Sequence, residues 1–292
     1  MQVAIYGRPS KGQTLDAAIK LISTLQSKGI EWRISDKLGE MVMRNGFKIP
    51  SNGIFFPDET LDANTSALFS IGGDGTILES VSIASAQQIP IVGIHTGRLG
   101  FLASIPYSGI EDVVSRLVHK NYLLDSRSLV SLQDNEGLFD GRNFALNEFA
   151  IMKRDSSAMI TVHTHLNGTY LNSYWADGLI TSTPTGSTGY SLSCGGPIIT
   201  PGNESFILTP VSPHNLNVRP LIVPDTSVFT YEVEGRSKKV LVSLDTRSRP
   251  VEITQKFSVQ KAPFKALFVR LPSDDFIDTL RSKLYWGADL RN

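Results

Sequence analysis

Residues 67–76 read ALFSIGGDGT, an apolar run of strand length that leads directly into a glycine-rich loop. The run predicts a buried β-strand ending at Ile71, and the helical pattern from about Thr76 predicts a helix directly after the loop. Glycines at such a junction let the backbone approach a phosphate closely, and free amides at the helix start attract its negative charge. The stretch therefore predicts a strand–loop–helix unit with a phosphate-binding turn.

Asp74 is the unusual member of this loop. An anion among phosphate-binding amides is useful mainly if it accepts a proton or helps to hold a metal ion, so Asp74 is a candidate general base. An isolated Gly-Asp-Gly also fits a tight strand-to-helix turn in which Asp74 caps the helix, and the loop alone does not decide between the two.

Similar strand and helix patterns surround this unit in the first third of the chain. The run VAIYG begins at Val3, apolar residues at 15, 18, 19 and 22 have helical spacing, and Gly29 closes that helix. Residues 91–94 predict a further strand and residues 110–120 a further helix. Repeated strand–helix units predict a mainly parallel sheet covered by helices, a Rossmann-like α/β domain over residues 1–121.

Beyond residue 122, apolar alternation with period two dominates, and turn pairs such as Asn167-Gly168 separate the runs. The candidate strands are 128–133, 145–153, 159–166, 228–233, 240–244, 251–259 and 266–269. We expect residues 122–270 to form a β-rich, sandwich-like domain of antiparallel sheets packed face to face. Residues 271–292, helical in pattern over 274–284, are expected to form a terminal helix that returns to the first domain.

The composition sets broad limits on function. The 292 residues are 41% hydrophobic and 19% charged, an ordinary globular composition for a two-domain chain. Lys+Arg and Asp+Glu balance at 28 each, which argues against a nucleic-acid or membrane partner. One cysteine, Cys194, and the lack of a signal-like N-terminus or a long apolar run predict a cytoplasmic protein.

Two further segments carry polar groups that suit a ligand. Residues 181–193, TSTPTGSTGYSLS, follow Asp177-Gly178 and offer hydroxyls and glycines for ribose and phosphate, with the Tyr190 ring for stacking on a base. Asn147-Glu148 interrupts the apolar run ALNEFAIM, where a buried carboxylate without a partner is costly and a ligand hydroxyl or amine would satisfy it. Each segment alone also fits a polar turn or an exposed strand face.

Taken together and in this order, the segments resemble the NAD kinase family. The motifs are GGDGT at 72–76, Asn147-Glu148, DGLITSTPTGSTGY at 177–190, GRLGFL at 97–102, GGP at 195–197 and SPHNLNVRPLIVP at 212–224. The resemblance spans most of the chain. It implies an enzyme that phosphorylates the adenosine ribose 2′-hydroxyl of NAD, with ATP or inorganic polyphosphate as donor, to give NADP.

The resemblance also implies roles for single residues. Asp74 is the implied catalytic proton acceptor, and the implied phosphate-binding residues are Gly72, Gly73, Gly75 and Thr76. The implied NAD-binding residues are Asp74, Gly75, Asn147, Glu148, Asp177, Thr188, Gly189, Tyr190, Ser191, Leu192 and Ser193. The family uses a divalent cation, usually Mg²⁺, which we expect to be held by nucleotide oxygens and water. The family resemblance also suggests a homodimer or homotetramer with contacts through the β-rich domain.

Four positions depart from the usual family pattern. Gly189 replaces a frequent alanine, and His95-Thr96-Gly97 replaces a frequent Asn-x-Gly. Asp245-Thr246-Arg247 replaces a frequent Asp-Gly-Gln, which leaves a ligand contact from that loop, and from Arg247 in particular, open. Glu79 stands where the family often has a basic residue, so we assume no contact between Glu79 and the donor.

Other conspicuous residues have ordinary explanations. His163 and His165 share one face of a predicted strand with no third metal ligand at a recognisable spacing, so we expect a solvated face. A backbone hydrogen bond would explain His214 as well as a substrate contact does, and Trp175 is expected to pack in the core.

Two alternative functions remain. GGDG loops also occur in diacylglycerol and sphingosine kinases and, with variation, in phosphofructokinases, but the TPTGSTGY segment argues against these enzymes. A noncatalytic NAD(H)-sensing protein on the same fold is the second alternative. The intact Asp74 argues against it, because binding alone requires no base there.

Overall fold

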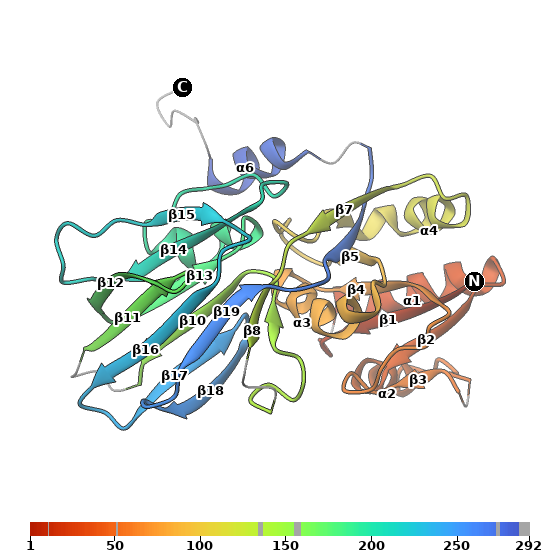
Figure 1. The fold of residues 1–292 in the computed structure, drawn as a ribbon. Helices are drawn as coiled ribbons and strands as arrows, with labels where there is room; N and C mark the ends of the chain where they lie inside the picture. Colours follow the sequence, from red (N-terminus) through yellow and green to blue (C-terminus); the bar gives the residue numbers. More distant parts are fainter. Residues whose placement is uncertain (11, 51, 134–136, 155–158, 273–274, 286–292) are drawn as a thin grey trace. The chain divides into compact units, whose positions relative to one another are not determined.

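The computed structural model describes residues 1–10, 12–50, 52–133, 137–154, 159–272 and 275–285 (Figure 1). The chain divides into two compact units. The first unit comprises Met1–Ser126 and the segment that begins at Ala266, and the second comprises Arg127–Lys265. The chain therefore passes between the units twice, and the first unit is discontinuous in sequence.

One sheet forms the centre of the first unit. Its described strands are β1 (Gln2–Gly7), β2 (Glu31–Ser35), β3 (Ile54–Phe55), β4 (Thr65–Ile71), β5 (Ile91–His95), β6 (Ile105–Pro106), β7 (Leu123–Arg127) and β20 (Ala266–Arg270). Their order is β3-β2-β1-β4-β5-β20-β7, with β6 beside β5. Neighbours from β3 to β20 run parallel, as predicted from the repeated strand–helix pattern.

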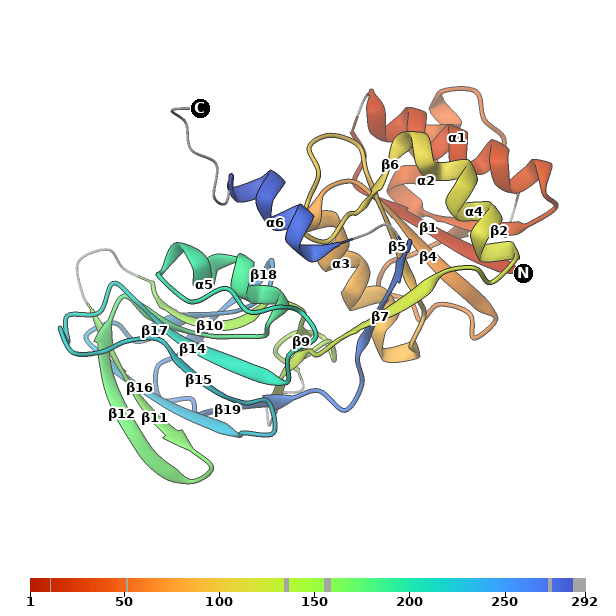
Figure 2. The same ribbon diagram turned by 90° about the horizontal axis from the view of Figure 1, so that it is seen from above.

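Helices cover both faces of this sheet (Figure 2). They are α1 (Gln13–Ser27), α2 (Asp36–Arg44), α3 (Asp74–Ala84) and α4 (Ile110–Val118), with short 3₁₀ turns at Ser85–Gln87 and Tyr107–Gly109. A further helix of this unit, α6 (Phe276–Leu284), lies apart from the sheet. Phe69 of β4 packs in the core that α1, α2 and α4 share, whereas the neighbouring Ser70 hydroxyl accepts a hydrogen bond of 2.8 Å from Ser80 of α3. Because successive strand residues face opposite sides, α3 covers the face opposite to α1.

The second unit is a sandwich of two antiparallel sheets. One sheet has the order β15 (Leu221–Pro224), β14 (Ser205–Val211), β13 (Gly178–Ser182), β10 (Glu148–Lys153), β17 (Lys239–Leu244), β18 (Arg247–Glu252). The other has the order β12 (Thr169–Ala176), β11 (Ile160–Leu166), β16 (Phe229–Gly235), β19 (Phe257–Lys261), β8 (Val130–Gln133), β9 (Phe144–Ala145). A 3₁₀ turn, η3 (Thr185–Thr188), and the short helix α5 (Tyr190–Ser193) follow β13.

Aromatic side chains from both sheets meet in the sandwich core. The Phe149 ring of β10 lies 5.9 Å from the Tyr231 ring of β16 and 6.0 Å from the Phe257 ring of β19, measured between centroids. All three side chains are buried. The packing of an α/β domain and a face-to-face β-sandwich confirms the predicted fold class.

Two predicted boundaries differ from the structure. The second unit begins at Arg127 and not at 122, because β7 joins the first sheet. The run at 266–269, predicted as a strand of the β-rich domain, is β20 of the first sheet, where Phe268 pairs with Ile91. Local alternation gives the strand and its buried side chains but does not say which sheet it enters.

Other elements differ in extent. The predicted strand 251–259 is interrupted by a turn at Ile253-Thr254, which separates β18 from β19. The sequence reasoning missed β2, α2, β3 and the strands from β12 to β15. The terminal helix begins at Phe276 and belongs to the first unit, with the Phe276 ring 6.5 Å from that of Phe101. Residues 273–274 and 286–292 of the predicted terminal segment lie outside the described residues.

Within the described ranges, none of the helices is both long and apolar enough to span a membrane.

Candidate active site

The glycine-rich loop lies between β4 and α3, as the sequence predicts. A Cβ on Gly72 would lie 2.4 Å from the Thr76 hydroxyl oxygen, so only glycine fits this close approach. By contrast, a Cβ on Gly73 or Gly75 would meet no atom within 4 Å, which leaves open space at the start of α3. Amides in the first turn of a helix have no partner within the helix, so this space suits an anion. Thr76, predicted as a phosphate contact, is buried beneath Gly72.

Asp74 begins α3, and backbone amides hold its carboxylate. Oδ2 accepts a hydrogen bond of 2.9 Å from the Phe101 amide, while Oδ1 accepts bonds of 3.1 Å from Leu102 and 3.4 Å from Ala103. A carboxylate offers about four acceptor sites, so this arrangement fixes its orientation and leaves capacity for a further donor. The segment GRLGFL, noted as family-like, therefore orients Asp74 through its last residues.

Gly100 makes this contact sterically possible. A Cβ at Gly100 would lie 1.9 Å from Asp74 Oδ1 and 2.6 Å from its Cγ. The loop backbone therefore lies directly against the carboxylate, and any other residue at 100 would displace one of them. Sequence reasoning missed this contact, for which Gly100 within GRLGFL was the available signal.

Glu79 lies in the second turn of α3 and is held on both oxygens. Its Oε1 accepts a bond of 2.6 Å from Arg8 Nη2, and its Oε2 accepts bonds of 2.9 Å from Arg8 Nε and 2.8 Å from the Tyr6 hydroxyl. Burial acts to raise the pKa of Glu79, but the bonds from Arg8 and Tyr6 outweigh it and the net pKa is lowered. Glu79 is therefore an anion engaged with Arg8.

In the second unit, Asn147 and Glu148 lie at the start of β10, and the Asp245 side chain accepts hydrogen bonds from their backbone amides. One Asp245 oxygen accepts bonds of 2.8 Å from the Asn147 amide and 3.2 Å from the Glu148 amide, and the other accepts a bond of 2.8 Å from Leu146. The Asp245 amide in turn donates to the Glu148 carbonyl at 3.1 Å. The loop Asp245-Thr246-Arg247, for which the sequence left a ligand contact open, thus positions the Asn-Glu pair through Asp245.

Arg247, the other charged residue of that loop, also binds backbone within the unit. Its guanidinium donates to the carbonyl of Arg142 at 2.5 Å and to that of Phe144. These bonds tie the start of β18 to Arg142 and to the first residue of β9. Its side chain thus supports the loop that carries Asp245.

The segment after β13 lies against the Asn-Glu pair. A Cβ on Gly186 would lie 2.1 Å from the Asn147 carbonyl oxygen, and one on Gly189 would lie 3.2 Å from Glu148 Oε2 and 3.4 Å from Asn147 Nδ2. Thr183 adds a bond of 2.9 Å from its amide to the Asn147 carbonyl. The structure therefore brings together two predicted segments that are about forty residues apart in sequence.

Glu148 of the second unit has a buried and strongly perturbed carboxyl group. Its Oε2 is inaccessible and has no hydrogen-bond partner among the described residues. Burial, and to a smaller extent the charge of Asp245, raise the pKa of Glu148 to about 8. A buried polar atom without a partner is costly, and at an otherwise well-bonded strand start it suggests that a ligand completes the bonding.

Tyr190 lies within electrostatic range of both Asp177 and Glu148. Burial is the largest cause of the raised pKa of Tyr190, and the charges of Asp177 and Glu148 add to it. Asp177 itself pairs with Lys153, with 2.6 Å between Nζ and Oδ1. Asp177 is therefore near Tyr190 but engaged in an ion pair.

The predicted stretch 188–193 divides into exposed and interior residues. Tyr190 and Ser193 are exposed, and Thr188, Gly189 and Leu192 are partly buried. Ser191 is buried, and its hydroxyl shares a bond of 2.8 Å with that of Thr209. Its side chain thus anchors α5 to β14.

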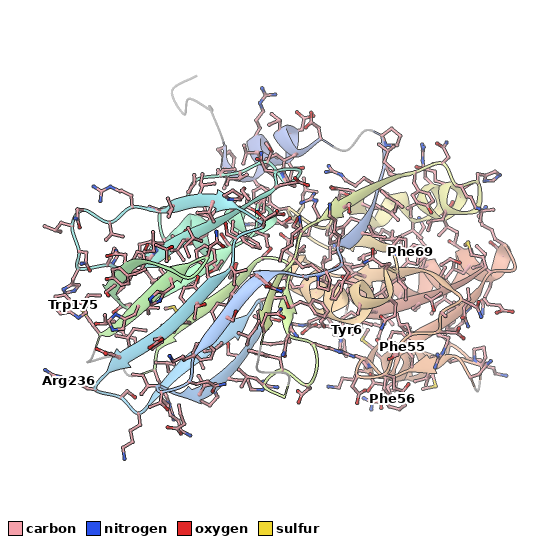
Figure 3. The ribbon with its side chains drawn as sticks, in the orientation of Figure 1. Tyr6, Phe55, Phe56, Phe69, Trp175 and Arg236 are labelled. Carbon is pink, nitrogen blue, oxygen red and sulfur yellow. The ribbon has the colours of Figure 1, made fainter. Side chains whose placement is uncertain are left out.

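The structure shows the surroundings of His163, His214 and Trp175, for which the sequence suggested ordinary explanations. His163 shares a bond of 2.7 Å with the Ser173 hydroxyl, and the described residues contain no group of three His, Cys, Asp or Glu side chains arranged for a metal ion. The amide of His214 donates to the Trp175 carbonyl at 2.9 Å. The expectation that Trp175 packs in the core is wrong: its side chain is 51% exposed (Figure 3), because β12 is an edge strand and the alternate residue, Tyr174, faces inward.

Comparisons with known proteins match both units of the chain. A family model for the ATP-NAD kinase N-terminal domain matches residues 3–122, and one for the ATP-NAD kinase C-terminal domain matches residues 146–271. The chain belongs to the ATP-NAD kinase family. An NAD kinase of Cytophaga hutchinsonii is 49% identical over 292 residues, which cover 100% of both chains.

Two solved structures of the family have the same fold. Yeast NADH kinase complexed with NADH is 24% identical with a TM-score of 0.86, covering 100% of this chain and 89% of that one. An NAD kinase from Archaeoglobus fulgidus in complex with ATP is 25% identical with a TM-score of 0.76, covering 99% of this chain and 100% of that one. Family membership makes the chain a kinase and confirms the predicted resemblance over the diacylglycerol and sphingosine kinase alternatives.

Proposed function

We propose that this chain transfers a phosphoryl group from ATP to the 2′-hydroxyl of the adenosine ribose of NAD and releases NADP and ADP. The observation that carries the proposal is the Asp74 carboxylate, fixed by three amides at the start of α3 beside open space. A base and an anion-binding helix start on one loop are the two groups that phosphoryl transfer to an alcohol requires.

Each residue of this loop has a distinct role in the proposed reaction. Phosphate oxygens of the donor bind the amides of Asp74 and Gly75 at the start of α3, where Gly73 and Gly75 leave room. Asp74 accepts the proton of the ribose hydroxyl as the new O–P bond forms, and the bond from the γ-phosphorus to the β–γ bridging oxygen breaks. The electron pair of that bond leaves with ADP.

The second unit supplies the groups for NAD. Asn147, Glu148 and the exposed Tyr190 ring bind the acceptor, with Asp245 holding the first two in place. The partnerless Glu148 oxygen supports this assignment, since a ligand donor or a protonated carboxyl would complete its bonding.

The cation that kinases require is proposed to arrive with the donor. Mg²⁺ is usually bound through one or two carboxylates and substrate phosphates, without a cage of protein ligands. Asp74 already accepts three amide bonds and is proposed to accept the ribose proton, so nucleotide oxygens and water would hold the cation. When bound, Mg²⁺ neutralises charge on the transferring phosphoryl group.

The first experiment measures NADP formation from NAD, ATP and Mg²⁺ with an NADP-specific dehydrogenase. Asp74→Asn should lower turnover by about 10²- to 10⁴-fold, the usual contribution of a general base. The control is Asp62→Asn, because Asp62 also accepts an amide bond, 3.0 Å from Asn64, but lies in another loop. Wild-type protein that binds NAD but forms no NADP with ATP or polyphosphate would instead support a noncatalytic NAD sensor.

We further propose a cytoplasmic homodimer or homotetramer that associates through the second unit. Trp175 and Tyr170 of the edge strand β12 have 51% and 57% of their surface exposed, which is unusual for large aromatic side chains. The molar mass by light scattering tests this proposal, and a concentration-independent monomer would contradict it.

A further inference from the structure

A cavity of about 660 Å³ lies at the carboxyl ends of three neighbouring strands of the first sheet. Arg8 and Pro9 follow β1, Lys37 lies just beyond β2, and Phe56 follows β3; Glu79 enters the lining from α3. In parallel sheets with helices on both faces, ligands bind at this edge, and the volume is in the range of about 300–1,000 Å³ seen for small-molecule sites.

One wall of the cavity is a three-residue cluster of Tyr6, Arg8 and Glu79. Two parallel bonds of 2.6 and 2.9 Å join the Arg8 guanidinium to the Glu79 carboxylate, and the Tyr6 hydroxyl donates to the same carboxylate at 2.8 Å. Figure 3 labels Tyr6 and Phe56, two of the residues that line the cavity. The fork geometry of such a pair fixes the plane of the guanidinium.

The Arg8 guanidinium keeps binding capacity for a ligand. Of its five N–H groups, two are used by Glu79. Its side chain is 57% exposed, whereas that of Glu79 is 28% exposed and forms the base of the cluster. Burial and the Glu79 carboxylate raise the pKa of Tyr6, so its hydroxyl stays protonated and donates across the physiological range. Glu79 and Tyr6 therefore present an oriented cation to the cavity.

The other lining groups fit a nucleotide complexed with a cation better than a bare anion. Lys37 adds a second positive charge to the lining, while Asp36 and Asp58 add two negative charges to that of Glu79. Such a mixed lining repels an uncompensated polyanion but suits phosphates that carry a divalent cation. The Phe56 ring, half-exposed at 50%, offers an apolar surface for a base.

We propose that Arg8 binds the phosphate chain of the nucleoside triphosphate donor and that Glu79 and Tyr6 are its positioning residues. This inference rests on the proposed kinase function and extends it. It explains why an acidic side chain at position 79 is compatible with an anionic donor: the carboxylate aligns a cation instead of meeting the phosphates itself.

The test is steady-state kinetics with ATP varied at saturating NAD, and then the reverse. Arg8→Ala should raise the KM for ATP about tenfold or more, the usual effect of losing a hydrogen bond to a charged group, and leave the KM for NAD unchanged. Arg116→Ala is the matched control, because Arg116 pairs with Asp112 at 2.7 Å on α4, away from the cavity lining. Equal ATP KM values for Arg8→Ala and the control would overturn the proposal.

Two further variants separate positioning from charge. Glu79→Gln should also raise the KM for ATP, because the fork is lost, although the local charge becomes more positive. A lower KM would mean that Glu79 only neutralises Arg8. The exchange Arg8→Glu with Glu79→Arg should recover part of what each single change loses, since it restores an oriented guanidinium on the same wall.

Direct binding distinguishes failure of this inference from failure of the proposed function. Calorimetry with Mg²⁺ and a non-hydrolysable ATP analogue needs no turnover, and Arg8→Ala should weaken binding by the same factor as it raises KM. If polyphosphate is also a donor, Phe56→Ala should weaken the use of ATP alone. Unchanged analogue binding by Arg8→Ala would refute the contact even in an active enzyme.

Discussion

The contact between Gly100 and Asp74 leads to the most direct prediction about catalysis. In Gly100→Ala, the added methyl carbon would lie 1.9 Å from Asp74 Oδ1, whereas real Cβ contacts are essentially never below 3.0 Å. The carboxylate or the loop must therefore move by about 1 Å, and a misplacement of that size at a reacting group costs about 10²-fold in rate. The amide bonds of 2.9 and 3.1 Å that hold Asp74 would lengthen with this movement.

The expected outcome is a loss of kcat of about 100-fold. Overpacking of this kind costs about 1–3 kcal/mol of stability, so the variant should still fold. NADP formation measures the first quantity and urea denaturation the second. Gly97→Ala is the control, because it adds the same methyl group to the same loop at a place where no atom lies within 4 Å. If Gly100→Ala and Gly97→Ala have the same turnover, Asp74 does not depend on this loop for its position.

Three further predictions concern other parts of the site. Asp245→Asn places an amide group against backbone amides and should raise the KM for NAD about tenfold, as expected for a lost bond to a charged group, but not the KM for ATP; unchanged NAD kinetics would remove Asp245 from the site. The raised pKa of Glu148, about 8 against an ordinary 4.5, means that the folded state binds an extra proton between these values, so its contribution to stability is present below about pH 4.5 and is lost as the pH rises to 8. Relative to Glu148→Gln, urea denaturation of the wild type should therefore show stability falling across this window by at most about 1.4 kcal/mol per pH unit, and a constant difference would contradict the assignment. Gly75→Ala fills open space in α3, so it should raise the melting temperature slightly through helix propensity while raising the KM for ATP; an unchanged KM would mean that phosphate does not approach Gly75.

Local sequence patterns predicted the fold class and singled out the loop of the first unit and the Asn-Glu pair of the second as candidate site residues. Strand periodicity and helix spacing identified β1, α1, β4, α3, β5 and α4, because these signals lie within one element. Asn147-Glu148 was visible because a charged residue interrupts an apolar run. These features require no knowledge of what lies across the fold.

The contacts that orient the site were not predictable in this way. Arg8 and Glu79 are 71 positions apart in sequence, and Asp245 is 97 to 99 positions from the residues whose amides donate hydrogen bonds to it. Sheet membership is equally non-local: the pattern of residues 266–270 suits a sandwich strand as well as a strand of the first sheet. Such pairings are decided by tertiary packing, which overrides local preference.

The position of β20 also constrains the order in which a nascent chain can fold. β20 lies between β5 and β7, and its residues follow the whole second unit in sequence. While the ribosome synthesises residues 127–265, only the short β6 pairs with this edge of β5, at Ile94 and His95, so the part of β5 that pairs with β20 stays open, and β7 has no strand to join in the first sheet. Exposed strand edges invite association with other chains, so we expect a risk of aggregation in the interval before residue 270 emerges.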